Sequence, residues 1–101
     1  MITGFPSPAQ GYEDGKIDLN KILIDRPSAT VFMRVASSRY MRMGIYDGDL
    51  LVIDRAKAIN PNSLVVYESD GKFVLGRVFN IHNEVIITGT IVYVIHKVKI
   101  Q

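Results

Sequence analysis

The sequence contains no cysteine, which excludes a disulfide, a thiolate zinc site and a cysteine nucleophile. Long apolar runs are also missing: the longest have four or five residues, whereas a membrane-spanning helix needs about 20. The formal net charge is only +2, too small by itself to indicate nucleic acid as the partner. The first residues lack the basic start and the apolar stretch of a signal peptide. We therefore expect a cytoplasmic protein without a membrane anchor.

The 101 residues, of which 48% are hydrophobic and 22% charged, indicate a single globular domain. A domain of this size buries only about two-thirds of the surface that its unfolded chain exposes, so a dimer would bury more. Residues 1–16 are rich in glycine, proline and polar groups, which favours an extended N-terminal arm, either docked on the domain or free. Residues 17–101 are expected to form the domain itself.

Only Ile17–Asp25 is expected to be helical. Asp18 is suited to cap this helix, its apolar residues share one face, and Pro27 ends it after at most about two turns. The rest of the chain is typical of short strands separated by polar turns. The expected strands are Thr30–Val35, Leu50–Asp54, Ser63–Tyr67, Lys72–Phe79, Glu84–Thr88 and Ile91–Val98.

The turns between these strands indicate an antiparallel arrangement. Asp70-Gly71 accepts the positive φ angles of a tight two-residue hairpin turn. Asn80–Asn83 is expected to close a second hairpin, between the fourth and fifth strands, and Gly89 to mark a bulge or bend. The sequence therefore predicts a mostly-β domain, an antiparallel sheet with one short helix.

Few residues indicate catalysis or ligand binding. His82 and His96 have no cysteine or carboxylate at metal-ligand spacing, so each is interpreted as an ordinary surface or sheet histidine. Asp47 and Asp49 flank Gly48, where turn formation explains them more simply than cation binding or acid–base work. There is no phosphate-binding glycine loop, and we expect neither a metal nor a cofactor.

A basic stretch lies at Arg34–Arg42, which carries three arginines and Tyr40, with no acid between Asp25 and Asp47. A basic patch with an aromatic ring can contact nucleic acid. A solvated face or a protein contact is the commoner role of such a patch. The sequence therefore leaves a direct DNA contact open.

Several segments resemble UmuD′, the processed form of the UmuD mutagenesis protein, and more widely the LexA family. The Gly-Phe-Pro-Ser-Pro-Ala start is the most specific, because it separates UmuD-type proteins from the repressors. The Gly-Ile-Tyr-Asp-Gly-Asp block is shared with LexA and phage repressors. The resemblance implies a small curved antiparallel sheet of the LexA and signal-peptidase type. The matching segments are Gly4–Ala9, Ile17–Asn20, Pro27–Thr30, Gly44–Asp54, Asp70–Phe73 and Val92–Lys97.

Active members of this family use a serine–lysine dyad, in which a neutral lysine deprotonates a serine that attacks a peptide bond in the chain's own arm. Aligned without a gap, Arg39 takes the place of the serine, Tyr40 that of the methionine after it, and Gly76 that of the lysine. Neither a guanidinium nor a glycine performs these steps, and the neighbouring Arg77 stays protonated. The resemblance therefore implies a degenerate peptidase fold that is not an enzyme.

A residual serine peptidase is the alternative, with Ser38 as a weak candidate nucleophile. Only a shifted alignment supplies Ser38, and it would still lack a base. UmuD loses an arm just before the Gly-Phe-Pro-Ser-Pro segment, and here Met1 stands three residues before Gly4, so we expect a chain that begins in the processed form. Between Phe79 and Tyr93 the chain is shorter than UmuD-type sequences, which carry a longer polar loop beside the cleft.

The resemblance implies a non-enzymatic accessory subunit of an error-prone Y-family DNA polymerase of the UmuC type, acting in SOS translesion synthesis. It also implies a homodimer, with a RecA filament or a host UmuD as further candidate partners. The alternative is a phage- or plasmid-type decoy that pairs with host UmuD or UmuD′. A repressor is excluded, because no helix-turn-helix segment is present. The expected contact residues are Phe5, Pro6, Asn20, Ile24, Val92, Val94 and His96.

Overall fold

A computed structural model describes residues 16–99 of the chain. The expected arm, including the contact residues Phe5 and Pro6, lies outside the described residues apart from Lys16, so its docking stays a prediction. Between residues 16 and 99, no helix has the length and apolar character needed to cross a membrane.

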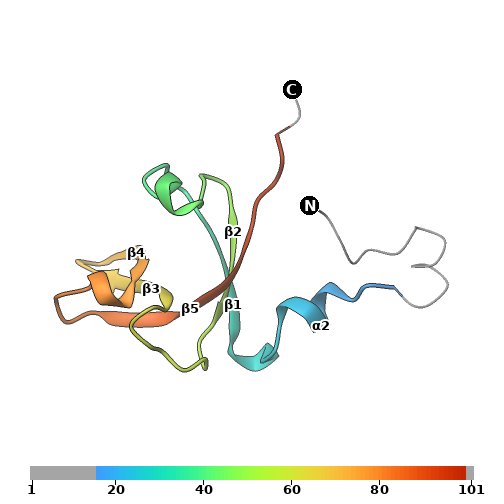
Figure 1. The fold of residues 1–101 in the computed structure, drawn as a ribbon, viewed down its shortest axis with the longest axis horizontal. Helices are drawn as coiled ribbons and strands as arrows, with labels where there is room; N and C mark the ends of the chain where they lie inside the picture. Colours follow the sequence, from blue (N-terminus) through green and yellow to red (C-terminus); the bar gives the residue numbers. More distant parts are fainter. Residues whose placement is uncertain (1–15, 100–101) are drawn as a thin grey trace.

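One antiparallel sheet forms most of the described part of the chain (Figure 1). Its five strands lie in the order β1-β2-β5-β3-β4, and each neighbouring pair is antiparallel. The bounds of the first four strands differ from the predicted ones by no more than two residues. The mostly-β fold class with one short helix is confirmed. The strands are β1 Thr30–Arg34, β2 Leu50–Asp54, β3 Leu64–Ser69, β4 Lys72–Arg77 and β5 Ile86–Ile95.

The last strand departs most from the prediction. The two strands expected at Glu84–Thr88 and Ile91–Val98 are one continuous strand, β5, which ends at Ile95. In Figure 1, β5 starts below β3 and β4 and then curves upward beside β2. It lies between β2 and β3 and does not pair with β4, so the predicted second hairpin is wrong.

The reason for this error lies where β4 ends. The chain leaves the sheet in a 3₁₀ turn, Val78–Asn80. The amide of Val78 donates to the carbonyl of Ser63, and the amide of Phe79 donates to the carbonyl of Pro61. These two hydrogen bonds direct the chain away from β4 before β5 begins. The short distance in sequence between β4 and β5 suggested a hairpin and gave no sign of this change of direction.

Gly89 explains how β5 fits between its neighbours. A Cβ at this position would lie 2.7 Å from Cγ2 of Ile53 and 3.1 Å from the carbonyl oxygen of Asp54. The strands approach this closely only because residue 89 has no side chain. The pairing of β5 with β3 shifts register between Gly89 and Ile87, so the predicted irregularity at Gly89 is confirmed.

The β3–β4 hairpin is as predicted. Asp70 has φ 53° and Gly71 has φ 77°, the two positive values that a tight turn of this type requires.

The helix α2 is shorter than predicted and covers only Leu19–Leu23. Asp18 caps it as expected, accepting a hydrogen bond from the Asn20 amide at 3.0 Å. Ile24 is already extended, and a 3₁₀ turn begins at Pro27. Figure 1 shows α2 beyond β1, on the side of the sheet away from β3 and β4. No residue of the helix is buried, so it contributes little to the core of a single copy.

The main core cluster lies on one face of the sheet, while Val52 and Val65 are fully buried on the other face. Side chains alternate between the two faces of a strand, and here the inward set comes from β2, β3 and β5 together with the segment that links β1 to β2. Residues of β1 and β4 cover its margin. The buried core residues are Val35, Tyr40, Ile45, Leu51, Ile53, Val66 and Ile91.

Candidate functional site

A cleft of about 500 Å³ lies between the segment that follows β1 and the start of β4. Its floor is the core itself, through Leu51 and Val66. Arg39 and Tyr40, which take the places of the family's serine and methionine, both line it. We call this space the cleft; its lining residues are Met33–Ser37, Arg39, Tyr40, Leu51, Val66, Lys72, Phe73 and Leu75.

Arg39 is exposed at the rim of the cleft. Its guanidinium carbon lies 5.3 Å from the centre of the Tyr40 ring, and its amide donates to Oγ of Ser37 at 3.1 Å. A guanidinium held over a ring in this way is a cation–π pair, and it offers no nucleophile. Ser38, the weak candidate nucleophile, is exposed and does not line the cleft.

Tyr40 is the residue of this site that the sequence analysis undervalued. It is buried, and its hydroxyl accepts a hydrogen bond from the amide of Leu75 at 3.3 Å. Because β4 is an edge strand, its backbone amides that point away from β3 have no partner within the sheet and can pair with an added strand. The Tyr40 hydroxyl accepts the hydrogen bond of one such amide, that of Leu75. A hydroxylated ring in place of a methionine was the only sequence signal for this contact.

Gly76 does not line the cleft. It lies in β4 opposite Val65, on the strand face that carries Tyr67 rather than Leu75. A Cβ on Gly76 would lie 3.5 Å from Cε1 of Tyr67, an ordinary contact. The structure therefore does not bring Arg39 and Gly76, the two positions that align with the family's dyad, into one pocket.

Lysine is not paired with serine here. Lys72 lines the cleft with Ser37, but it is exposed, and no hydrogen bond joins a serine hydroxyl to a lysine anywhere in residues 16–99. A lysine acts as a base in this chemistry when burial favours its neutral form. Lys72 has no such burial.

The Asp49 turn, Tyr46–Asp49, has a structural role. Asp49 is buried, and one carboxylate oxygen accepts the amide of Tyr46 at 2.8 Å. The other oxygen lies 2.6 Å from Nδ1 of His96, which donates because an ionised carboxylate only accepts. Burial would raise the pKa of Asp49, but these contacts outweigh it and hold the pKa below its ordinary value. The interpretation of the Asp-Gly-Asp motif as a turn agrees with this geometry.

A second buried carboxylate, Asp54, ends β2. It pairs with Arg26 and also accepts the amide of Ala56 at 2.9 Å. Burial would raise the pKa of Asp54, but these partners hold it below its ordinary value. The pair ties the segment after α2 to the sheet, and sequence reasoning did not find it.

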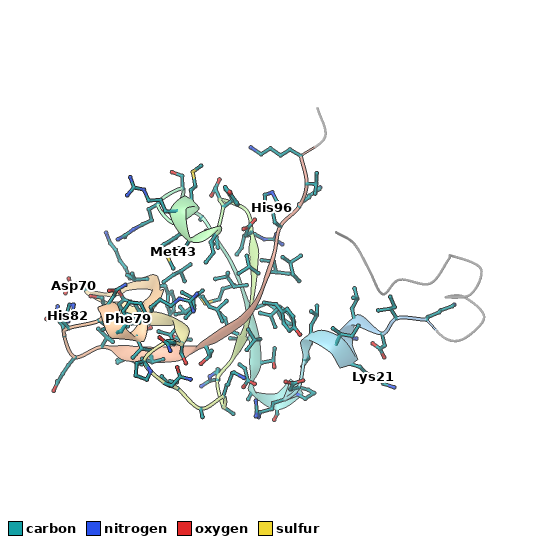
Figure 2. The ribbon with its side chains drawn as sticks, in the orientation of Figure 1. Lys21, Met43, Asp70, Phe79, His82 and His96 are labelled. Carbon is teal, nitrogen blue, oxygen red and sulfur yellow. The ribbon has the colours of Figure 1, made fainter. Side chains whose placement is uncertain are left out.

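The two histidines lie far apart, with His82 near the tip of the β3–β4 hairpin and His96 beside the Asp49 turn (Figure 2). Within residues 16–99, no group of three or more metal-binding side chains converges. The three arginines of the basic stretch do not form one patch of equivalent groups. Arg34 donates to the carbonyl of Gly48 at 3.0 Å, and Arg39 stacks on Tyr40. Arg42 is exposed on a 3₁₀ turn, Met41–Met43.

The described contact residues fall in two regions that the structure joins. Asn20 is exposed on α2 and Ile24 half-buried after it, while Val92 and Val94 are half-buried in β5 and His96 follows the strand. The hydroxyl of Tyr93 donates to the carbonyl of Ile22 at 3.3 Å, which links β5 to α2. Sequence reasoning named the neighbours of Tyr93 but missed Tyr93 itself, because alternation along a strand does not tell which face is covered.

Comparison with known proteins supplies the family. The model for Peptidase S24-like domains matches residues 1–94. The chain belongs to the Peptidase S24-like family. Among curated relatives, Protein ImpA of Salmonella typhimurium is 43% identical over 74 residues, covering 73% of this chain and 51% of that protein. Protein MucA of Escherichia coli is 43% identical over 77 residues, covering 76% of this chain and 53% of its own length.

A third relative of this S24-like domain, Protein SamA of Salmonella typhimurium strain LT2, is 42% identical over 74 residues, 73% of this chain and 53% of its own. The chain spans about half the length of the curated relatives it matches. The expected resemblance to a UmuD-like domain of the S24 family is confirmed.

Proposed function

We propose that this S24-like domain is a non-enzymatic, UmuD′-like accessory subunit of an error-prone Y-family DNA polymerase of the UmuC type, acting in SOS translesion synthesis. The kinship with ImpA, SamA and MucA supports a part in SOS mutagenesis. The observation that carries the non-enzymatic half is the state of the dyad positions. Arg39 stacks on Tyr40, and Gly76 faces the Tyr67 ring outside the cleft.

The cleft gives a second reason to propose binding without cutting. Peptidases of this kind need an extended substrate beside a nucleophile and its base. Here the outward amide of Leu75 is already bonded to Tyr40, and the lysine at the cleft is exposed. An approaching strand would first have to displace the Tyr40 hydroxyl.

Co-expression with a UmuC-type polymerase subunit tests the partnership. We expect the two chains to co-purify through affinity and size-exclusion steps, and the complex to support DNA synthesis past a lesion. A UmuD-deficient strain complemented by this chain would agree with the proposal. Failure to bind any UmuC-type subunit, with the chain shown to be folded, would contradict it.

We further propose that the subunit is a homodimer joined through the α2 face, which we define as Leu19, Ile22, Phe32, Tyr93 and Ile95. Phe32 and Tyr93 flank Val52 in one row across β1, β2 and β5, opposite the core face. All five defining side chains are at least 40% exposed, although they are large and apolar. A contiguous apolar surface of this kind on a small domain is typical of an interface.

Analytical ultracentrifugation of two variants tests the dimer. Ile22→Asp places a charge in the α2 face and is expected to yield monomers. Ile86→Asp is the matched control, because Ile86 is also exposed, at 68%, but lies at the far end of β5. Equal dimerisation of both variants would contradict the proposed interface.

The decoy is the second candidate, and the same exposed α2 face favours it, since the face could equally accept a related chain. Mixing with a UmuD′ partner separates the two functions. A mixed dimer together with lost mutagenesis indicates a decoy, whereas restored mutagenesis in a UmuD-deficient strain indicates the accessory subunit.

A further inference from the structure

A second cavity, of about 400 Å³, lies beside the loop that joins β2 to β3 and shares no lining residue with the cleft. Figure 1 shows this loop in yellow-green below β5. We call the cavity the Lys57 pocket. Its polar lining residues are Lys57, Asn60, Asn62, Ser63, Arg77 and Thr90, and the rest of its wall comes from Leu64 and residues 91–94.

The charge of the Lys57 pocket is positive. Lys57 and Arg77 line it, and none of its lining residues is an aspartate or a glutamate. Among residues 16–99, the ion pairs are Arg26–Asp54 and His96–Asp49, so neither cation of the pocket is neutralised by a described carboxylate. The guanidinium of Arg77 donates to the carbonyl of Asn62 at 2.9 Å, which fixes it at the pocket and leaves its other N–H groups to donate.

The neutral polar groups of the pocket are arranged as donors. Oδ1 of Asn60 already accepts the amide of Asn62 at 2.9 Å, and Oγ of Ser63 accepts the amide of Asn60 at 3.0 Å. Their remaining N–H and O–H groups are left to donate. Thr90 adds a hydroxyl that is buried without a hydrogen-bond partner in the described part of the chain. Such a group is costly unless something accepts from it.

We infer that the Lys57 pocket binds a phosphate group, carried either by a nucleotide or by a nucleic-acid strand. The donors come from the loop, from the end of β4 and from β5, and donors from three directions suit a tetrahedral oxyanion better than a planar carboxylate. This inference goes beyond the proposed function, which does not require the subunit to contact nucleotides.

Binding to the full chain tests the inference with three probes: inorganic phosphate and thymidine monophosphate by calorimetry, and a fluorescent oligothymidylate by anisotropy. We expect Lys57→Gln to weaken binding roughly tenfold, the usual cost of one charge-assisted hydrogen bond. It should also lower the salt dependence of oligonucleotide binding by about one ion. Arg77→Gln should act similarly and Arg77→Lys less. Lys99→Gln removes the same charge from an exposed site outside the pocket and should change nothing.

The probes separate the sources of the phosphate. Comparable binding of all three indicates a phosphate or nucleotide site, and binding of the oligonucleotide alone indicates a nucleic-acid strand. No measurable binding, or binding weakened by Lys99→Gln and not by Lys57→Gln, would overturn the inference. So would preferential binding of an acidic peptide. No polymerase is present in this assay. A failure to bind phosphate is therefore distinct from a failure to bind a polymerase subunit, which is what the proposed function requires.

Discussion

The Asp49 turn and the cleft are neighbours, joined by backbone hydrogen bonds between the turn and the cleft residue Val35, and they differ in how their polar groups are used. In the turn, the Asp49 carboxylate is buried and both of its oxygens are bonded, to the Tyr46 amide and to His96. In the cleft, Arg39 is exposed and stacked on a ring, and a tyrosine closes the β4 edge. The comparison teaches that the turn uses its polar groups to hold the fold, whereas the cleft presents an arginine and a tyrosine at the positions that align with the family's serine and methionine.

Removing the carboxylate of the turn should give the largest effect. Asp49→Ala leaves the Tyr46 amide without its acceptor and His96 without its partner, and we expect a loss of about 3 kcal/mol in the free energy of unfolding. Asp47→Ala is the matched control, because Asp47 is exposed in the same turn, and should stay within about 0.5 kcal/mol. Urea unfolding measures both. Equal losses of unfolding free energy in the two variants would contradict the structural role assigned to the Asp49 carboxylate.

The next effect compares two glycines. Gly89→Ala places a Cβ 2.7 Å from Cγ2 of Ile53, beside a backbone that cannot move freely, and we expect a loss of about 2 kcal/mol. Gly76→Ala meets only ordinary contacts with Tyr67, so its stability should change much less. Thermal unfolding of the two variants side by side checks this. A Gly76 variant as unstable as the Gly89 variant would show that the β4 edge is packed more tightly than the structure indicates.

Tyr40→Phe should give a smaller effect, about 1 kcal/mol, because it removes one hydrogen bond to the Leu75 amide and keeps the buried ring. Amide hydrogen exchange should show faster exchange at Leu75, with little change at Val66 on the cleft floor. Unchanged exchange at Leu75 would mean that the Tyr40 hydroxyl does not protect the edge of β4.

The pH dependence should be the mildest difference near neutrality. The pKa values of Asp49 and Asp54 are lowered in the folded state, so the unfolded state binds more protons as the pH falls. Their stabilisation is therefore present above the ordinary carboxyl pKa, about 4, and is lost as the pH falls through the lowered values. Urea unfolding between neutral and acidic pH measures this loss. Asp49→Asn should lose less stability over that range, and an identical slope would contradict the role assigned to the carboxylate.

Much of the fold could be predicted from sequence, because local chemistry determines it. Asp70-Gly71 forms its turn and Asp18 caps its helix with groups that are neighbours in the chain. The pairing of β5 could not be predicted, because it depends on the close approach of Gly89 to Ile53, from a distant part of the chain. At the site, alignment identified Arg39 in the cleft, whereas Gly76 lies outside it. The Tyr40–Leu75 contact joins residues 35 positions apart, and only coordinates reveal it.

We propose that this domain binds partners but does not cut peptide bonds, and a cleavage assay tests this proposal most directly. The chain is incubated at mildly alkaline pH with a UmuD-type protein that retains its arm, and the products are separated by mass. The account predicts that the substrate stays intact. Cleavage by the chain that is abolished by Ser38→Ala would contradict it.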